Sequence, residues 1–433
     1  MTASRDVVRI CQDLIRIDTS NYGDEDGPGE REAADYVAEF LKDLGLDPTI
    51  RESEPGRASL TCLWKGADRT RPALVVHGHL DVVPAFADDW SVDPFGAEIK
   101  DGMVWGRGAV DMKNMDAMIL ATVANMIDAG IKPARDIVIA FFADEEHGGA
   151  RGAKWMVENH PEDFRGASEA ISEVGGFSTY VNGRRAYLVQ TAEKGIQWLR
   201  LVAGGQQGHG SLIHADNAVT HLAGALARIG EYEWPLEISP TVEQLLRGVA
   251  ELTDVEFEPT EECVAKLIDG LGANARMIAA TVRNTSNPTM MDAGYKTNVI
   301  PDTATGFVDT RFLPGQQENV LRTIEELAGT HAKVENYITE RSLEVPFDVP
   351  LVDKMIAALG VEDPGAPVLP YALMGGTDNK HLAAIGIAGY GFAPLQLPED
   401  LDFPSLFHGI DERIPVESLH FGQRVLTTFL KDC

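Results

Sequence analysis

The sequence predicts an α/β protein in which a mostly parallel sheet flanked by helices is interrupted by an inserted α+β domain. Continuous apolar runs at Ala73–Val76 and Ile137–Ala143 are typical of strands buried on both faces of a sheet. Segments with helical periodicity, Glu30–Leu44 and Met115–Ala129, alternate with these runs. Near Thr191 the pattern changes to half-exposed strands and Gly-rich turns, which indicates a second domain.

The two helical segments carry their own boundary signals. Glu30–Leu44 has an apolar stripe at the helical period, and Gly45 ends it. Met115–Ala129 is followed by Gly130 and then by Pro133. Alternation of helices and buried strands favours a parallel sheet, and in such sheets functional residues collect at the carboxyl ends of strands. We therefore expect a functional site directly after the apolar runs.

The second domain is predicted to be an insertion. Gly195–Ala203 alternates like a half-exposed strand, and the run GGQQGHGS and a helix from Ala215 follow it. The later segments are, in order, a helical stretch at about Pro235–Gly272, strand candidates Met277–Arg283, Lys296–Ile300 and Gly306–Phe312, a helix Gln317–Gly329 and a strand near Lys333–Thr339. After about Pro346 the α/β pattern resumes through Val352–Leu359 and ends in a final helix Val416–Leu430. We predict one domain of residues 1–192 and 344–433 and an insert of residues 193–343, in which the role of the long helical stretch is open.

Charge and cysteine content narrow the function classes. The 433 residues include 37 Lys and Arg against 67 Asp and Glu, a net charge of −30. Such a field repels phosphate backbones and anionic lipid, which disfavours nucleic acid and membranes as partners. The N-terminus lacks the apolar stretch of a signal peptide, and no apolar run approaches the ~18 residues of a spanning helix. Four scattered cysteines without a C-x-x-C pair suit a reducing compartment, so we expect a cytoplasmic protein.

Carboxylates and imidazoles follow the predicted strands. They are His79 and Asp81 in HGHLD after the first apolar run, Asp111 in the Gly-rich turn RGAVDMK, Glu145 and Glu146 in DEEHGG after the second run, Glu173 in SEVGG, and His408 in HGIDE. Each has a structural alternative, since a lone histidine is often satisfied in a core and Asp111 suits a helix N-cap. Together they share one location, the strand-end loops of a single sheet.

This set of side chains predicts a pair of metal ions. Two imidazoles and three carboxylates suit Zn²⁺, with Co²⁺ or Mn²⁺ as substitutes. Five ligands exceed one tetrahedral site and match two ions that share a bridging carboxylate, ~3.5–4 Å apart in hydrolytic enzymes. Three ligand carboxylates against two divalent cations leave one positive charge, which a bound hydroxide would neutralise.

Seven motifs in fixed order resemble those of the M20 metallopeptidase family, and most closely its carboxypeptidase S and aminoacylase branch. The motifs are GHLDVVP, GRGAVDMK, DEEHGG, SEVGG, GHGS, GGTD and HGIDERI, and the match runs from about Arg5 to Leu430. The resemblance implies a catalytic α/β domain with two zinc ions and an inserted lid domain that usually dimerises. It also implies a hydrolase that cleaves the amide bond of small peptides or N-acyl amino acids with a free carboxylate, and a homodimer through the lid.

The resemblance further implies a role for each motif residue. At the metal centre it places His79 on one ion, Asp111 between both ions, Glu146 and His408 in one site, Glu173 in the other, Glu145 as the general base that activates the zinc-bridged water, and Asp81 behind His79. Toward the substrate it places His209 of GHGS on the scissile carbonyl, often from the partner subunit, and Asn298, Arg311 and the backbone of Gly375 and Gly376 on the substrate's carboxylate.

Two alternatives stay open from the sequence. A biosynthetic deacetylase or desuccinylase would use the same residues with a different pocket, and a binding homologue would keep the fold without catalysis. Other hydrolase classes are disfavoured, because the sequence has neither the G-x-S-x-G nucleophile turn of serine hydrolases nor the H-E-x-x-H motif of zincins.

Overall fold

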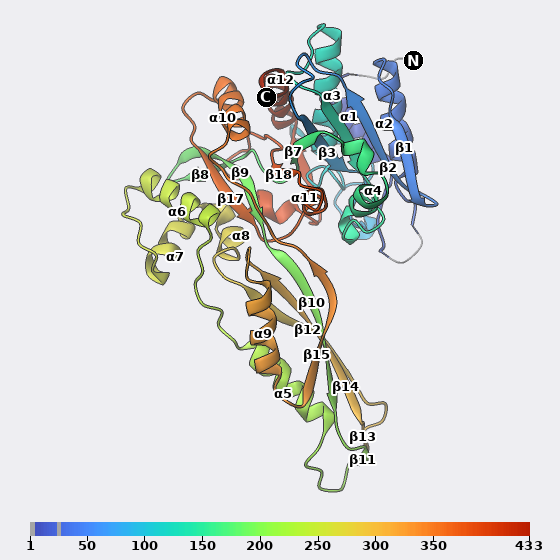
Figure 1. The fold of residues 1–433 in the computed structure, drawn as a ribbon, viewed down its shortest axis with the longest axis vertical. Helices are drawn as coiled ribbons and strands as arrows, with labels where there is room; N and C mark the ends of the chain where they lie inside the picture. The colour runs from blue at the N-terminus through green and yellow to red at the C-terminus, as the bar shows by residue number, and fades with distance from the viewer. Residues whose placement is uncertain (1–4, 24–26) are drawn as a thin grey trace.

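The computed structural model describes residues 5–23 and 27–433, which form two bodies (Figure 1). The larger one, here called the main body, is built on a ten-stranded sheet. Its strand order is β1 (Thr49–Glu54), β2 (Arg57–Trp64), β6 (Ile137–Phe142), β3 (Ala73–His79), β7 (Ala167–Ser172), β18 (Ala388–Gly391), β9 (Arg184–Glu193) and β16 (Leu343–Glu344), with β8 (Phe177–Val181) and β17 (Val368–Leu373) also paired to β9.

The centre of this sheet is parallel, as predicted. β6, β3, β7 and β18 run in one direction, and the antiparallel pairs lie toward the edges, at β1 with β2 and at β8 and β16 with β9. β3 and β6 are buried along their whole length, which explains their continuous apolar sequences. The predicted α/β class with a mostly parallel sheet is therefore confirmed.

Helices cover both faces of the main sheet. One face packs against the larger core, to which α1 (Val7–Arg16), α2 (Arg31–Asp43), α3 (Lys113–Asp128), α10 (Pro350–Glu362) and α12 (Val416–Asp432) contribute. The other face packs against α4 (Ala153–Asn159) and α11 (Asn379–Ala383). A short sheet of β4 (Ile99–Lys100), β5 (Met103–Trp105) and β19 (Arg413–Pro415) links the loop before α3 to the loop before α12.

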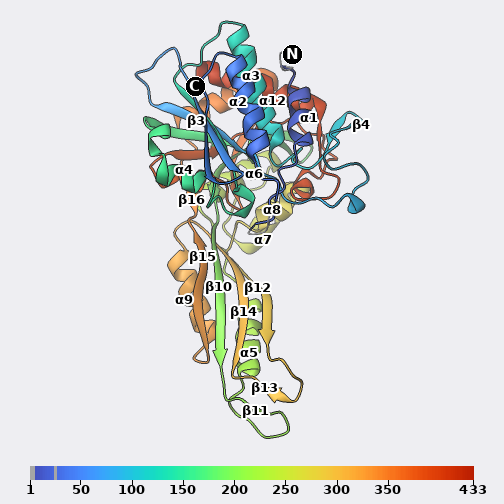
Figure 2. The same cartoon turned by 90° about the vertical axis from the view of Figure 1, so that its right-hand side faces the viewer.

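The second body, here called the arm, extends away from the main body (Figures 1 and 2). It is an antiparallel sheet in the order β12 (Thr285–Ala293), β14 (Thr303–Phe312), β10 (Gly195–Gly204) and β15 (Ala332–Glu340), with α5 (Ala218–Gly230) and α9 (Gln317–Ala328) packed on it. A two-stranded ribbon of β11 (Gly208–His209) and β13 (Val299–Ile300) forms its far tip. β10 and β14 bury alternate residues, as their sequences predict.

The long helical stretch of the predicted insert belongs to the main body. It forms α6 (Pro240–Thr253) and α7 (Glu261–Asp269), and α8 (Ala275–Ala279) follows it. The buried residues of all three helices join the larger core rather than the core of the arm. The strand expected at Met277–Arg283 is wrong, because Met277 and Ile278 point into that core from a helix. The strand in this part of the chain is β12, which begins after the predicted segment and lies exposed at the edge of the arm sheet. Its register is irregular at Pro288, and a proline is tolerated in an edge strand.

Among the described residues, no helix is long and apolar enough to cross a membrane.

Candidate metal centre

The five predicted metal ligands lie together where the central parallel strands end. His79 is the last residue of β3, Glu146 lies in the 3₁₀ turn Glu145–His147 after β6, Glu173 follows β7, Asp111 precedes α3, and His408 precedes β19. Parallel strands place their carboxyl ends at one edge of the sheet, so residues distant in sequence converge there.

The ligands form two groups that share Asp111. In the first, His79 Nε2 lies 3.0 Å from Asp111 Oδ1 and 3.6 Å from Glu173 Oε2. In the second, His408 Nε2 lies 3.2 Å from Asp111 Oδ2 and 2.9 Å from Glu146 Oε2. The candidate ligand atoms of each group lie within 4.8 Å of one another. Each carboxylate oxygen of Asp111 therefore faces one group, which is the arrangement a bridging ligand requires.

The donor set fits two divalent cations. Each group offers one imidazole and two carboxylates, a combination suited to Zn²⁺, Co²⁺ or Mn²⁺. Within the part of the chain that the structure describes, buried Glu146 Oε1 finds no hydrogen-bond partner. A buried carboxylate oxygen without a partner is costly, and a cation would satisfy it.

Protons balance the carboxylates when cations are absent. Burial opposes ionisation of Asp111, but hydrogen bonds from His408 and His79 outweigh it and lower its pKa. Bonds to Asp111 and Glu146 raise the pKa of His408 to about 11. Burial opposes protonation of His79, yet Glu173 and Asp111 outweigh it and raise its pKa well above the usual value. Burial raises the pKa of Glu173 to about 7. The centre thus holds protons that a cation must displace.

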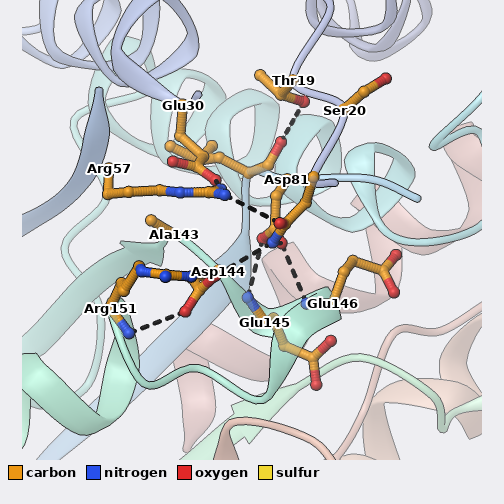
Figure 3. Close-up of polar contacts among 12 residues, drawn as sticks. Thr19, Ser20, Glu30, Arg57, Asp81, Ala143, Asp144, Glu145, Glu146 and Arg151 are labelled. Atoms are coloured by element: carbon orange, nitrogen blue, oxygen red, sulfur yellow. Dashed lines mark hydrogen bonds and ion pairs between the residues drawn. The ribbon is translucent and has the colours of Figure 1, made fainter. Parts of the chain in front are cut away.

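Asp81 anchors the metal centre from behind (Figure 3). Its carboxylate accepts the backbone N–H groups of Glu145 and Glu146 at 3.1 and 3.0 Å, while their own carboxylates point away from it. The nearer partner of His79 Nδ1 is the Asp81 backbone carbonyl at 2.9 Å, whereas its carboxylate is 3.5 Å away. Because the carbonyl can only accept, Nδ1 carries a proton, and Nε2 is the nitrogen that would bind metal once the cation displaces the proton it shares with Asp111.

Glu412 is a second anchor, and only its place in the motif HGIDERI marks it in the sequence. Its side chain is fully buried. The carboxylate accepts hydrogen bonds from the backbone N–H groups of Gly108, Val110 and Asp111, and it forms an ion pair with Arg107. These bonds fix the backbone that presents the Asp111 carboxylate. The loop before α12 therefore supplies both His408 and the support for Asp111.

A buried polar network behind Asp81 was not predicted. The Asn21 amide donates to Asp81 and Asp144 at 2.8 and 3.2 Å, and its oxygen accepts from Arg57 at 3.0 Å. Arg57 also pairs with buried Glu30 at 2.6 Å. These residues lie in the N-terminal loop and in β2, apart from every motif, so no pattern in the sequence marks them.

Four of the five candidate ligands, Asp111, Glu146, Glu173 and His408, line a pocket of about 540 Å³ that also contains Glu145. Burial and neighbouring Glu173 raise the pKa of Glu145 well above the usual carboxyl value. The pocket has an apolar side formed by Val174, Met277, Ala280, Leu373, Met374, Pro404 and Phe407.

Part of the predicted carboxylate-binding set lines the same pocket. Arg311, Gly375 and Gly376 are present, and Arg311 forms a two-pronged ion pair with Asp309 at 2.7 and 3.1 Å. The pocket also contains Lys194, which donates to the carbonyl oxygens of Ala280 and Arg283 at 2.9 Å each. Burial and, after it, Arg311 lower the pKa of Lys194 to about 7.

His209 and Asn298 lie elsewhere, at the tip of the arm. His209 ends β11, and the Asn298 carbonyl accepts the backbone N–H of Gly210 at 2.9 Å. β10 alone has 10 residues, and at ~3.3 Å per residue it separates the tip from the main sheet by about 30 Å. No side chain spans that distance, so the tip does not complete the pocket of its own chain in this conformation.

Known proteins resemble this chain over most of its length. The model for peptidase family M20/M25/M40 matches residues 75–432. An N-fatty-acyl-amino acid synthase/hydrolase, PM20D1, of Xenopus tropicalis is 29% identical over 96% of this chain and 83% of that protein. A probable carboxypeptidase S-like protein of Dictyostelium discoideum is 28% identical over 83% and 71%, and human aminoacylase-1 is 26% identical over 88% and 85%.

Solved structures agree over almost the whole chain. The M20 family metallo-carboxypeptidase Sso-CP2 from Sulfolobus solfataricus has a TM-score of 0.74 at 17% identity, covering 99% of both chains. The YXEP protein of Bacillus subtilis, described as a dinuclear metal binding peptidase from the M20 family, has a TM-score of 0.57 at 13% identity and covers 98% and 96%. At these identities the likeness shows the fold.

Glu412 gives a test of the support for Asp111. We expect Glu412→Gln to weaken zinc affinity about 10–100-fold, because an amide holds the three backbone N–H groups less well and Asp111 loses its fixed position. Competition titration with a chromophoric chelator measures this affinity. The neighbouring Asp411→Asn is the matched control, since the Asp411 carboxylate accepts the backbone N–H of Ser91 rather than those of the turn that presents Asp111. Equal affinity in Glu412→Gln and wild type would contradict the anchoring role.

Metal binding should depend on pH because the cations displace protons. Ligands bind metal in their deprotonated forms, and the pKa values of Glu173, about 7, and His408, about 11, are both raised. Lowering the pH keeps these groups protonated, so we expect zinc affinity to rise with pH between 6 and 8, by about tenfold per unit for each proton released. Calorimetry in buffers of different ionisation enthalpy counts those protons, and binding without proton release would contradict this account.

Proposed function

The chain belongs to peptidase family M20/M25/M40, as its motifs predict, and from that membership we propose that it is a dizinc hydrolase of small peptides or N-acyl amino acids with a free carboxylate. Relatives of this chain are described as aminoacylases, carboxypeptidase S-like proteins and N-fatty-acyl-amino acid synthase/hydrolases. The observation that carries the proposal is the pair of ligand groups that share Asp111 beside Glu145 in one pocket.

The proposed mechanism divides the work between the cations and Glu145. His79, Asp111 and Glu173 would hold one ion, and Asp111, Glu146 and His408 the other. When bound, two such ions lower the pKa of a water toward ~7 and polarise a carbonyl oxygen. Glu145 takes the proton of the attacking water and returns it to the leaving nitrogen, so one carboxylate acts first as base and then as acid. Asp81 and Glu412 hold the geometry in which this transfer occurs.

The pocket supports a substrate with one charged and one apolar end. Arg311 suits a carboxylate, which a guanidinium binds through two parallel hydrogen bonds, and that carboxylate would replace Asp309 as its partner. The backbone of Gly375 and Gly376 lies in the same pocket. The apolar side, with Met277, Leu373 and Phe407, suits an apolar acyl group or side chain.

A second copy of the chain would complete this site. His209 and Asn298 lie at the exposed tip of the arm, far from the pocket of their own chain. In a homodimer through the arm, the tip of one chain would reach the pocket of its partner, where His209 would stabilise the oxyanion and Asn298 would help to bind the substrate. A donor aimed at such an oxyanion is worth about 2.7–4 kcal/mol in an acyl-transfer enzyme.

Two further features belong to the proposal. Zinc is the proposed ion because the centre has one imidazole per group, although Co²⁺ and Mn²⁺ would fit the same ligands. A cytoplasmic location is supported by the four cysteines, which are all free thiols and lie within the described residues.

Neighbouring glutamates separate catalysis from metal binding. We expect Glu145→Gln to keep both metal ions and to lower kcat by about 10²–10⁴-fold, because the amide cannot accept the proton of the water. Glu146→Gln is the contrast, since it removes a ligand and should lower metal content as well. The effect is measured as turnover of N-acetyl, N-succinyl and long-chain N-acyl amino acids and of dipeptides. Each substrate is assayed both with its free C-terminal carboxylate and as the C-terminal amide. Full activity of Glu145→Gln, or equal use of the acids and their amides, would contradict the proposal.

Mixed dimers test whether His209 acts on the partner. His209→Ala chains lack the tip group, and Glu145→Gln chains lack the base, so neither homodimer should turn over substrate well. After co-expression in equal amounts, about half the dimers are mixed and each has one intact site, which would restore about a quarter of wild-type activity. The control is a mixture of the two separately purified homodimers under conditions in which subunits do not exchange, so that no mixed dimers form. Activity that stays at the level of the parents would place His209 in its own chain's site or outside catalysis.

A further inference from the structure

A second group of metal-binding side chains lies on the arm, apart from the main-body centre. Asp216 precedes α5, His221 lies in the second turn of α5, and His331 immediately precedes β15. One candidate ligand atom from each of these residues lies within 4.8 Å of the others. The three residues come from separate segments that meet where β10 ends, toward the tip of the arm (Figure 1).

His221 is oriented as a metal ligand would be. Its Nδ1 lies 3.0 Å from the Gly204 carbonyl oxygen, which can only accept, so Nδ1 carries the proton and Nε2 keeps its lone pair. Ligating histidines usually donate their second N–H to a carbonyl or carboxylate in this way. Only 14% of the His221 side chain is exposed, and the His331 ring stacks on it with centroids 4.2 Å apart. Asp216 Oδ1 lies 3.7 Å from His221 Nδ1.

Backbone bonds hold the three segments in place. Gln206 N–H donates to the Asp216 carbonyl at 2.9 Å, and Ala203 pairs with Ala332, the residue after His331. Gly205 lets the chain pass close to the start of α5, since a Cβ there would lie 2.4 Å from the Ala218 nitrogen. The positions of the three side chains are therefore set by the fold of the arm.

We propose that Asp216, His221 and His331 bind one divalent transition-metal ion, such as Zn²⁺, Ni²⁺ or Cu²⁺. Two imidazoles and one carboxylate select these ions over Ca²⁺ and Mg²⁺, which require mostly oxygen ligands. Three protein ligands leave a fourth position of a tetrahedral ion to water. The net charge of −30 favours any cation at the surface, but only this geometry selects the metal class.

The bound ion would order the tip of the arm. The loop from β10 to α5 carries β11 and His209, and Asp216 lies at the end of that loop. An ion that joins Asp216 to His221 and His331 ties the end of the loop to both α5 and β15. The ion adds a further attachment at the α5 end of the loop, which reduces the motion of β11 relative to the sheet.

Zinc counting on the full-length protein tests the site. After equilibration with buffered free zinc, we expect wild type to hold one more zinc ion per chain than His331→Ala or His221→Ala, measured by elemental analysis. In an Asp111→Asn background, which removes the shared ligand of the main-body centre, His331→Ala should still remove one ion. The matched control is His160→Ala, since His160 also lies beside a carboxylate, Glu162 at 3.3 Å, but belongs to none of the candidate ligand groups.

Hydrogen exchange gives a readout that does not depend on total metal. Zinc should slow the exchange of residues 205–217 in wild type and in His160→Ala, but not in His331→Ala. Equal zinc content in wild type and His331→Ala, with circular dichroism showing both folded, would overturn the site. So would loss of a zinc ion from His160→Ala. In His331→Ala, Glu145 and all five ligands of the main-body centre are unchanged. Failure of the arm site would therefore leave the proposed catalysis unaffected.

Discussion

The structure depends on holding several carboxylates together at one edge of a buried sheet. Asp111, Glu146 and Glu173 lie within contact distance of two imidazoles, and Glu145 lines the same pocket. Burial alone would push such acids toward their neutral forms. The pKa of Glu145 is raised well above normal, whereas that of Asp111 is lowered because two imidazoles bind it. Positive charge at this place, carried by protons or by divalent cations, is therefore a condition for the fold as well as for chemistry.

Two buried carboxylates outside the ligand set make that arrangement possible. Asp81 binds the backbone of the turn that presents Glu145 and Glu146, and Glu412 binds the backbone of the turn that presents Asp111. Both accept converging N–H groups, whose backbone dipoles favour the charged carboxylate. Hydrogen bonds and His79 outweigh burial and lower the pKa of Asp81, whereas burial raises the pKa of Glu412 to about 7. The ligands can then repel one another without moving apart, because the turns that carry them are tied down from behind.

The sequence allows prediction of those features that depend on a local residue pattern or on the direction of the strands. Buried strands such as β3 read as apolar runs, and parallel order then predicts that His79, Glu146 and Glu173 meet. Asn21, Arg57 and Lys194 escaped prediction because their role comes from tertiary contacts that no spacing records. The strand predicted at α8 is wrong because its apolar residues, packed against the main-body core, form a continuous run too short to show a helical period.

The stiffness of the arm decides which pocket its tip can reach. Only Lys194 separates β9 of the main sheet from β10 of the arm, and its ammonium is bonded to the chain that enters β12. At the other junction, Lys380 of α11 pairs with Glu340 at the end of β15 at 2.6 Å, and both are largely buried. Breaking such a buried pair costs about 3–5 kcal/mol. Folding the arm back so that the tip meets its own pocket would change the junction that these two contacts hold. The proposed docking of another chain's tip leaves both contacts as they are, which is the physical reason to expect that an imidazole from the tip would come from a partner.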